Sequence, residues 1–311
     1  MKNILITDSL FIFPEHEKML KDAGFNIERL DKPQATEDEL IEALKDKHGY
    51  ILGGIEKVTD KVIASTDTLE AICFTGSDYR YFIPGYKLAQ EKGISITNCP
   101  GVNSGAVAEY TITLMFAMMR DIFDLGRTGS ATFRTTPSLS DSTVGIIGMG
   151  HIGQKVARML KALGVKNINY SNRTRNEGLE KELGINYLPI EKLLLKSDIV
   201  TIHVSKEAGE KYFNTEYIKL LKDNSILINC AFESIVDEEA LYVELLSGRI
   251  RCAQDGPAHD PRYKDLPLHI WFNSNAGTGF NTHEANKAAS DMSTKSIINL
   301  LTTGTDGYKI K

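Results

Sequence analysis

Residues 143–153 read TVGIIGMGHIG, and this stretch decides which fold the sequence predicts. Gly148, Gly150 and Gly153 stand in GxGxxG spacing, directly after an apolar run and before the amphipathic stretch GQKVARMLKALG. In this pattern the first glycine permits a tight turn, the second lets a pyrophosphate approach the backbone, and the third lets helix and strand pack closely. The helix N-terminus adds N–H donors for phosphate. The context favours a dinucleotide-binding βαβ unit over a glycine-rich turn without a ligand.

The next strand of this unit ends in NINYSNRTRN, residues 167–176. A site for NAD usually carries Asp or Glu about 20 residues after the glycine loop, where it binds the ribose 2′-hydroxyl. Ser171 and Asn172 stand there instead, and Arg173 and Arg175 follow. Guanidinium groups pair with phosphate through charge-assisted hydrogen bonds. We therefore expect NADP(H) to be favoured, with NAD(H) possible; the alternative is that both arginines are solvated surface residues.

The rest of the chain predicts a second α/β domain beside this unit. With 311 residues, the chain is longer than the ~100–200 residues of a typical domain. Strands are expected at 2–8, 25–30, 49–54, 69–74, 144–147, 167–170, 199–203, 225–230, 251–254 and 270–274. Helices are expected at 14–24, 36–44, 104–120 and 282–304, and Thr36 with Glu39 three residues on predicts a capping box at the start of the second helix. Residues 120–142 read as an irregular arm. Strands that alternate with helices in this way indicate parallel sheets covered on both faces.

Composition excludes several classes of protein. A hydrophobic content of 42% excludes a disordered chain, and a net charge of −5 argues against a nucleic-acid or anionic-membrane binder. The apolar stretch at 111–119 is shorter than the ~20 residues of a membrane span. The cysteines lack CxxC spacing and the histidines lack metal-ligand spacing, so no metal is expected. With no signal peptide evident either, we expect a cytoplasmic protein with free thiols and a small-molecule partner.

Beyond the glycine loop, successive blocks resemble the D-2-hydroxyacid dehydrogenase family. The blocks are TNCPGVNSGAVAEYT, TVGIIGMGHIGQKVARMLKALG, SDIVTIHVS, LLKDNSILINCA, IVDEEALYVELLSGRI and THEANKAA. The resemblance implies an α/β protein of two doubly wound parallel-sheet domains. A flavodoxin-like substrate domain would span 1–101 plus 283–311, and a Rossmann NAD(P)-binding domain would span 102–282. It also implies an NAD(P)-dependent oxidoreductase acting on a CH–OH group, and a homodimer formed through the 104–120 helix and the following arm.

The resemblance also assigns site residues. The expected cofactor contacts are Gly148, Met149, Gly150, His151, Ile152, Gly153, Ser171, Asn172, Arg173, Thr174, Arg175, His203, Val204, Cys230, Ala231 and Asp255. The expected substrate loop, which in the family binds a carboxylate through backbone N–H groups, is Thr75, Gly76, Ser77 and Asp78. An ordinary βα turn is the alternative for that loop, because Gly and Asp are common in turns.

The catalytic positions depart from the family pattern. The family uses an Arg to orient the substrate, a His as general acid/base and a Glu that orients the His. The matching positions here are Phe232, Gly277 and Asp260. The residues that could take over the missing roles are His259, His283, Glu233 and Arg80, each of which could equally be a solvated surface residue.

Three hypotheses follow. The first is an oxidoreductase whose 2-hydroxyacid activity is atypical or lost and whose substrate is an imine or an activated carbonyl. The second is an ordinary 2-hydroxyacid dehydrogenase of the glycerate, glyoxylate or hydroxypyruvate type, if the catalytic residues are aligned wrongly. The third is a non-catalytic cofactor-binding module. The place expected for Gly277 discriminates among them, because an imidazole from another residue at that place in the structure would restore the second hypothesis.

Overall fold

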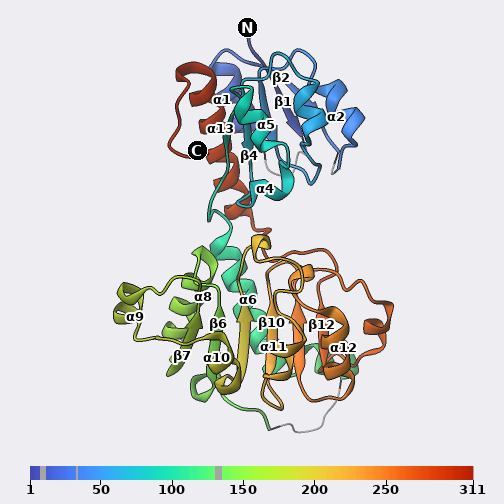
Figure 1. Ribbon diagram of the computed structural model, residues 1–311, viewed down its shortest axis with the longest axis vertical. Coiled ribbons are helices and arrows are strands. Elements are labelled where there is room, and N and C mark those ends of the chain that lie inside the picture. The colour runs from blue at the N-terminus through green and yellow to red at the C-terminus, as the bar shows by residue number, and fades with distance from the viewer. Residues whose placement is uncertain (8–11, 33, 130–134, 311) are drawn as a thin grey trace. The chain divides into compact units, whose positions relative to one another are not determined.

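The computed structural model describes residues 1–7, 12–32, 34–129 and 135–310, and the chain divides into two compact units (Figure 1). Unit 1 consists of Met1–Asn103 and Thr282–Lys311, and unit 2 of Ser104–Asn281. Each unit is built around its own parallel sheet.

Unit 1 has the strand order β2-β1-β3-β4-β5, with every pair parallel, which is the order of flavodoxin-like folds. Its elements are β1 (Asn3–Thr7), α1 (Pro14–Asp22), β2 (Asn26–Leu30), α2 (Glu37–Ala43), β3 (Gly49–Leu52), α3 (Asp60–Ala64), β4 (Ala71–Phe74), α4 (Tyr79–Phe82), α5 (Tyr86–Glu91), β5 (Ser95–Thr97) and α13 (His283–Thr303). The predicted flavodoxin-like class is confirmed.

Helices cover both faces of the unit 1 sheet because successive strand residues point to opposite sides. Ile4 and Ile6 of β1 pack with Leu20 of α1 and Ile297 of α13. Leu5, between them, faces the opposite core, to which α2, α3 and α5 contribute. Figure 1 shows α1 and α13 together on one side of the strands and α2 on the other. Near-continuous apolar strands are therefore buried on both faces, as the sequence predicts.

Two helices of unit 1 begin at threonines whose side chains cap them. Thr36 accepts a hydrogen bond from the backbone N–H of Glu39, whose carboxylate accepts from the N–H of Thr36, so the capping box of α2 is confirmed. The Thr282 side chain likewise accepts from the N–H of Ala285 at the start of α13. Gly304 ends α13 at φ +74°, a conformation that glycine adopts without strain.

Unit 2 has the strand order β12-β11-β10-β9-β6-β7-β8, again with every pair parallel, which is a Rossmann order with one added strand. Its elements are α6 (Ser104–Met119), α7 (Ile122–Thr128), η1 (Leu139–Asp141), β6 (Thr143–Ile147), α8 (His151–Ala162), β7 (Asn167–Ser171), α9 (Glu177–Leu183), β8 (Asn186–Tyr187), α10 (Ile190–Lys196), β9 (Ile199–Ile202), η2 (Lys206–Ala208), α11 (Thr215–Lys219), β10 (Ile226–Asn229), η3 (Glu233–Ile235), α12 (Glu238–Leu246), β11 (Arg251–Gln254), η4 (Pro261–Asp265) and β12 (Trp271–Asn273). Because β6 is followed by β7 on one side and β9 lies on the other, the strand order reverses at β6. Ligands of open α/β sheets bind at such a reversal, beyond the carboxyl ends of the strands.

The expected irregular arm at 120–142 is wrong in part. Residues 122–128 form α7, which starts after Asp121 turns the chain at φ +52°. The ring of Phe123 stacks on Phe272 with centroids 3.8 Å apart, and this long-range contact stabilises a helix that Gly126 does not favour. Residues 130–134 of the arm, and Asp8 of the first expected strand, lie outside the described residues. The short strands β5 and β8 were not expected.

Within the described ranges, no helix is both long enough and apolar enough to cross a membrane. The same ranges contain no group of three His, Cys, Asp or Glu side chains arranged as metal ligands.

Candidate functional site

The glycine loop after β6 has close contacts that leave no room for a side chain at two of its three glycines, Gly148 and Gly153. A Cβ on Gly148, which has φ +93°, would lie 2.6 Å from the carbonyl oxygen of His203. A Cβ on Gly153 would lie 2.1 Å from the carbonyl oxygen of Gly148. Gly150, just before α8, has no atom within 4 Å of that position. The backbone here is therefore open to an approaching group, and the N-terminus of α8 points its N–H groups toward it.

His203 follows β9 beside this loop and is buried. The ring Nε2 of His203 lies 2.9 Å from the hydroxyl of Thr201, and the backbone N–H of His203 donates to the carbonyl of Ile147. Its Nδ1 is buried without a hydrogen-bond partner in the described part of the chain. Burial lowers the pKa of His203 to about 3, so the imidazole is neutral. A buried ring nitrogen without a partner, next to an open glycine loop, fits a bound dinucleotide that supplies the missing contact.

The two arginines that follow β7 differ in their contacts. Asn172 accepts a hydrogen bond from the N–H of Met149 and thereby ties this segment to the glycine loop. Arg175 donates two hydrogen bonds to Glu180, at 2.9 and 2.8 Å, and this pairing raises the pKa of Arg175. Arg173 is exposed and makes no hydrogen bond or ion pair with another described residue. Arg173 is therefore the available guanidinium of the two.

Asp255, predicted to contact a cofactor, has a clear structural role. It follows β11 and accepts hydrogen bonds from the hydroxyl of Ser274 and the N–H of Thr278 on one oxygen, and from the N–H of Gly279 on the other. These bonds hold the loop that contains Gly277, which has φ +62° and open space where a Cβ would lie. No imidazole is attached to the chain at position 277.

Cys230 and Ala231 follow β10 on the same edge of the sheet. Burial raises the pKa of the Cys230 thiol to about 12, so it stays protonated. Ala231 donates its N–H to the side chain of Asn229. Their predicted roles as cofactor contacts, like those of His151, Ile152, Thr174 and Val204, stay predictions.

Phe232 has a cationic neighbour that sequence reasoning missed. The Nζ atom of Lys206 lies 4.9 Å from the centre of the Phe232 ring, and both side chains are partly buried. Lys206 belongs to the loop after β9, and β9 pairs directly with β10. The only sequence signal was a lysine three residues after His203.

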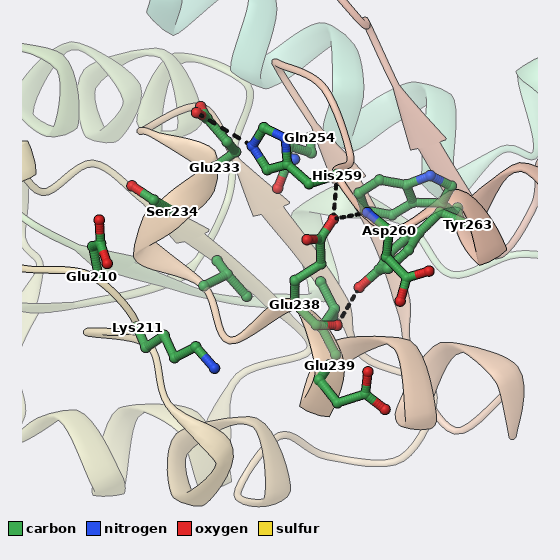
Figure 2. Close-up of a pocket in the computed structure, with 13 residues that line it drawn as sticks. Glu210, Lys211, Glu233, Ser234, Glu238, Glu239, Gln254, His259, Asp260 and Tyr263 are labelled. Atoms are coloured by element: carbon green, nitrogen blue, oxygen red, sulfur yellow. Dashed lines mark hydrogen bonds and ion pairs between the residues drawn. The ribbon is translucent and has the colours of Figure 1, made fainter.

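A pocket of about 360 Å³ lies beside this loop, within unit 2 (Figure 2). Its lining includes the carboxylates of Glu210, Glu233, Glu238, Glu239 and Asp260, with Tyr263 and Trp271. The Glu233 carboxylate points toward the ring of His259, with 3.8 Å between Oε1 and Nε2. Glu233 and His259, which the sequence indicates as possible replacements for the missing catalytic residues, are thus close together.

Asp260, which the sequence resemblance predicts at the position of the family's Glu, pairs with Arg262. It accepts hydrogen bonds from the side chain and the N–H of Arg262, and these bonds lower the pKa of the Asp260 carboxyl. Its own N–H donates to Glu238, as does that of His259. An ionised carboxylate held by a guanidinium is a poor proton donor.

In unit 1, the predicted substrate loop is clamped between β4 and the turn after β5. Thr75 donates both its N–H and its hydroxyl to the carbonyl of Leu52. Ser77 donates its hydroxyl to the carbonyl of Cys99 and accepts from the side-chain amide of Asn98. The N–H groups of Gly76 and Ser77 donate to no acceptor among the described residues, as an anion-binding turn requires.

The remaining candidates in unit 1 lie on its surface. His283 is exposed at the start of α13, with its ring 5.5 Å from that of Phe13. Arg80 is exposed near the rings of Tyr79 and Tyr86. The buried His16 uses both ring nitrogens, because Nε2 meets Asp291 and Nδ1 accepts from Phe13 N–H.

Comparison with known proteins identifies similar chains. Residues 112–276 match the family model of the D-isomer specific 2-hydroxyacid dehydrogenase, NAD binding domain. A D-3-phosphoglycerate dehydrogenase from Methanocaldococcus jannaschii is 33% identical over 97% of this chain, which spans only 58% of that relative. A glyoxylate reductase from Korarchaeum cryptofilum is 33% identical over 69% of this chain and 71% of its own length.

A solved structure shares the whole fold. It is an acyclic imino acid reductase in complex with NADPH and D-Arg, which superposes with a TM-score of 0.86 over 100% of both chains at 23% identity. At this identity the likeness shows the fold alone.

Proposed function

The chain belongs to the D-isomer specific 2-hydroxyacid dehydrogenase family, and from this premise we propose that it is an oxidoreductase that prefers NADP(H) and whose 2-hydroxyacid activity is atypical or lost. The observation that carries the proposal is a contrast on one edge of the unit 2 sheet. The glycine loop has the spacing and the tight contacts of a dinucleotide site, whereas Phe232 and Gly277 stand where the resemblance predicts the family's Arg and His.

The preference for NADP(H) rests on Arg173. No carboxylate at the end of β7 would repel a 2′-phosphate, and Arg173 is exposed next to Asn172, which contacts the glycine loop. Arg175 is engaged with Glu180, so we assign it to holding the loop. NAD(H) is the alternative cofactor, since the matching family model is described as NAD binding.

The change at positions 232 and 277 affects proton supply and charge stabilisation. A bound nicotinamide supplies a hydride to the substrate carbon. Phe232 cannot donate a hydrogen bond to a forming oxyanion, and Gly277 has no side chain that could deliver a proton. A positioned acid accelerates such steps by roughly 10²–10⁴. We therefore expect the protein to reduce 2-oxo acids slowly, because no side chain at these two positions can protonate the carbonyl oxygen.

We propose a substrate that needs less help from a protein acid. Reduction of a carbonyl adds a hydride and a proton, whereas reduction of an iminium ion adds only the hydride. A neutral imine becomes an iminium ion by taking up one proton before the hydride is added, and His259, with Glu233 beside it, is the group we assign to passing that proton from bulk water. The similar fold of an imino acid reductase is compatible with this substrate class.

Two other functions have support. The glyoxylate reductase and phosphoglycerate dehydrogenase relatives favour ordinary 2-hydroxyacid chemistry of the glycerate, glyoxylate or hydroxypyruvate type. A complete cofactor cradle beside altered catalytic positions would also suit a non-catalytic cofactor-binding module. NADPH oxidation measured with 2-oxo acids, alone and with an added amine, separates the three. Oxidation that requires the amine supports the proposal, oxidation without it supports the ordinary enzyme, and none with either supports the module.

The homodimer and the cytoplasmic location stay predictions. The helix α6 is apolar around much of its circumference, and Phe116 of α6 and Ile122 of α7 remain 37% and 53% exposed. A second copy of the chain would cover them. A monomer by light scattering at micromolar concentration would contradict the dimer. The cytoplasmic location rests on the free thiols of all four cysteines.

A further inference from the structure

The pocket of about 360 Å³ in unit 2 has an acidic lining that proton transfer at His259 does not explain. Glu210 follows η2, Glu233 begins η3 and Glu238 begins α12, and Figure 2 shows all three around the pocket. No lysine or arginine of the described residues forms an ion pair with any of these three carboxylates. Glu233 meets the ring of His259 at 3.8 Å, and Glu238 accepts the backbone N–H groups of His259 and Asp260. The pocket therefore carries negative charge that its own cations do not balance.

The cations that contact other residues of the lining are held by carboxylates of their own. The Nζ of Lys211 lies 3.2 Å from Oδ1 of Asp237. Arg262 donates to both Asp260 and Glu239, so two carboxylates share one guanidinium. Neither cation is left over for Glu210, Glu233 or Glu238. A positive group that binds these three carboxylates thus has to come from a ligand.

Two buried polar groups in the same lining lack hydrogen-bond partners, which is independent of the charge. The hydroxyl oxygen of Ser234 is buried and has no partner among the described residues. Trp271 is 4% exposed, and its indole N–H donates to no acceptor in the described part of the chain. Buried hydroxyl and indole groups usually find a partner. A ligand in the pocket would supply both contacts, since a hydroxyl oxygen accepts from an ammonium group and an indole N–H donates to an oxygen.

The spacing of the acidic groups favours an organic cation over a metal ion. The described ranges contain no group of three His, Cys, Asp or Glu side chains arranged as metal ligands. A metal ion needs several oxygens to converge within roughly 2–2.6 Å of it. An ammonium group on a carbon chain can instead reach carboxylates that stand apart. The pocket volume also falls in the range of roughly 300–1,000 Å³ that is typical of small-molecule sites.

We propose that this pocket binds a small organic cation, a primary amine that also carries a hydroxyl or carbonyl oxygen. The ammonium group binds the Glu233 carboxylate and the Ser234 hydroxyl, and the oxygen of the ligand accepts the indole N–H of Trp271. Because Glu233 directly follows Phe232, the bound amine lies beside one of the altered catalytic positions. The site goes beyond the proposed redox function and does not depend on hydride transfer.

The test is a calorimetric titration with 4-amino-1-butanol, which has one ammonium and one hydroxyl group. The neutral 1,4-butanediol and the anionic 4-hydroxybutyrate are the matched compounds and should not bind. Glu233→Gln should weaken binding of the amine roughly tenfold or more, the range of a charge-assisted hydrogen bond. Ser234→Ala and Trp271→Phe each remove one neutral hydrogen bond and should weaken it roughly two- to tenfold. Glu216→Gln removes an exposed carboxylate of α11 outside the pocket and should bind the amine like the unmodified protein.

Three results would overturn the inference: no binding of the amine, equal binding of 1,4-butanediol, or the same loss of affinity in Glu216→Gln as in Glu233→Gln. The last result would reveal a non-specific attraction to an acidic protein. Thermal unfolding shows that each variant is folded, and Ser234→Ala keeps the test decisive if Trp271→Phe is unstable.

A separate titration with NADPH distinguishes this inference from the proposed function. A protein that binds NADPH and no amine overturns the inference and leaves the proposed function standing. A protein that binds the amine and no NADPH supports the inference and refutes the proposed function.

Discussion

The ends of β6 and β10 lie on the same edge of one parallel sheet, and the two are constrained differently. At the end of β6, a side chain on Gly148 or Gly153 would overlap backbone atoms. At the end of β10, Phe232 is partly exposed and contacts Lys206 from the next loop. Beyond β12, Gly277 has open space around it.

This difference shows how chemistry can change on a constant frame. The loops around Phe232 and Gly277 are held by other residues, since Asn229 bonds the backbone of Ala231 and Asp255 bonds that of Thr278. The side chain at 232 can therefore vary without moving the backbone, and at 277 there is space for a side chain although φ +62° strains most residues. The glycine loop has no such freedom, because its packing and its ligand-binding geometry depend on the same atoms.

The largest effect is expected from Gly153→Ala. Its Cβ would lie 2.1 Å from the carbonyl oxygen of Gly148, so the loop must shift. We expect NADPH binding to be lost and the free energy of unfolding to fall by roughly 1–3 kcal/mol or more. Cofactor fluorescence and thermal unfolding measure these effects. Gly126→Ala in α7, with no atom within 4 Å, is the control: it should leave NADPH binding unchanged and should not lower stability, since alanine favours a helix by up to about 1 kcal/mol over glycine. If Gly153→Ala binds NADPH as tightly as the unmodified protein, the glycine loop is not constrained in the way that its contacts indicate.

The next largest effect is expected at Phe232 and Gly277. The unmodified protein should oxidise NADPH negligibly with glyoxylate, hydroxypyruvate or pyruvate, and Phe232→Arg/Gly277→His should raise the rate by roughly 10² or more. Gly277 has φ +62°, a strain of about 1–2 kcal/mol for most residues that histidine tolerates better than most. Steady-state rates decide the matter. Robust turnover by the unmodified protein would show that the family roles are assigned to the wrong residues.

A smaller effect is expected when the arginine assigned to the cofactor preference is removed. Arg173→Ala should weaken NADPH binding by roughly 1.5–3 kcal/mol and leave NADH nearly unchanged. Arg175→Ala is the matched comparison, and it should affect NADPH less because Arg175 is already paired with Glu180. Fluorescence titration of the unmodified protein and both variants with each cofactor measures the six affinities. Equal affinities for NADPH and NADH in the unmodified protein would refute the preference.

The smallest effect is a dependence of stability on pH that arises from His203. Its pKa is about 3 in the folded chain and near 6.5 when unfolded. As pH falls below about 6.5, the unfolded chain binds a proton that the folded chain does not, so stability falls by roughly 2 kcal/mol at pH 5. Denaturant unfolding between pH 7 and pH 5 should show this loss. His203→Gln should flatten the slope, whereas the exposed His283→Gln should leave it unchanged. The same slope in both variants would argue against a buried neutral imidazole.

Much of the fold followed from local sequence signals. The spacing of Gly148, Gly150 and Gly153 after an apolar run was enough to predict the β6–α8 unit, and Thr36 with Glu39 predicted the start of α2. Helix α7 and the short strands β5 and β8 could not be predicted in this way. They depend on partners far along the chain, such as Phe272 for Phe123.

The sequence by itself determined the residue types at the site: three spaced glycines, two arginines without a preceding acid, and Phe232 and Gly277 at the altered positions. Only the tertiary structure decided which of these groups are engaged. Glu180 holds Arg175 and leaves Arg173 exposed, Arg262 occupies Asp260, and Lys206 meets the Phe232 ring. The physical reason is that pairing, burial and pKa depend on distances between loops that follow different strands. Those distances are set by the order of strands in the sheet, which local sequence does not specify.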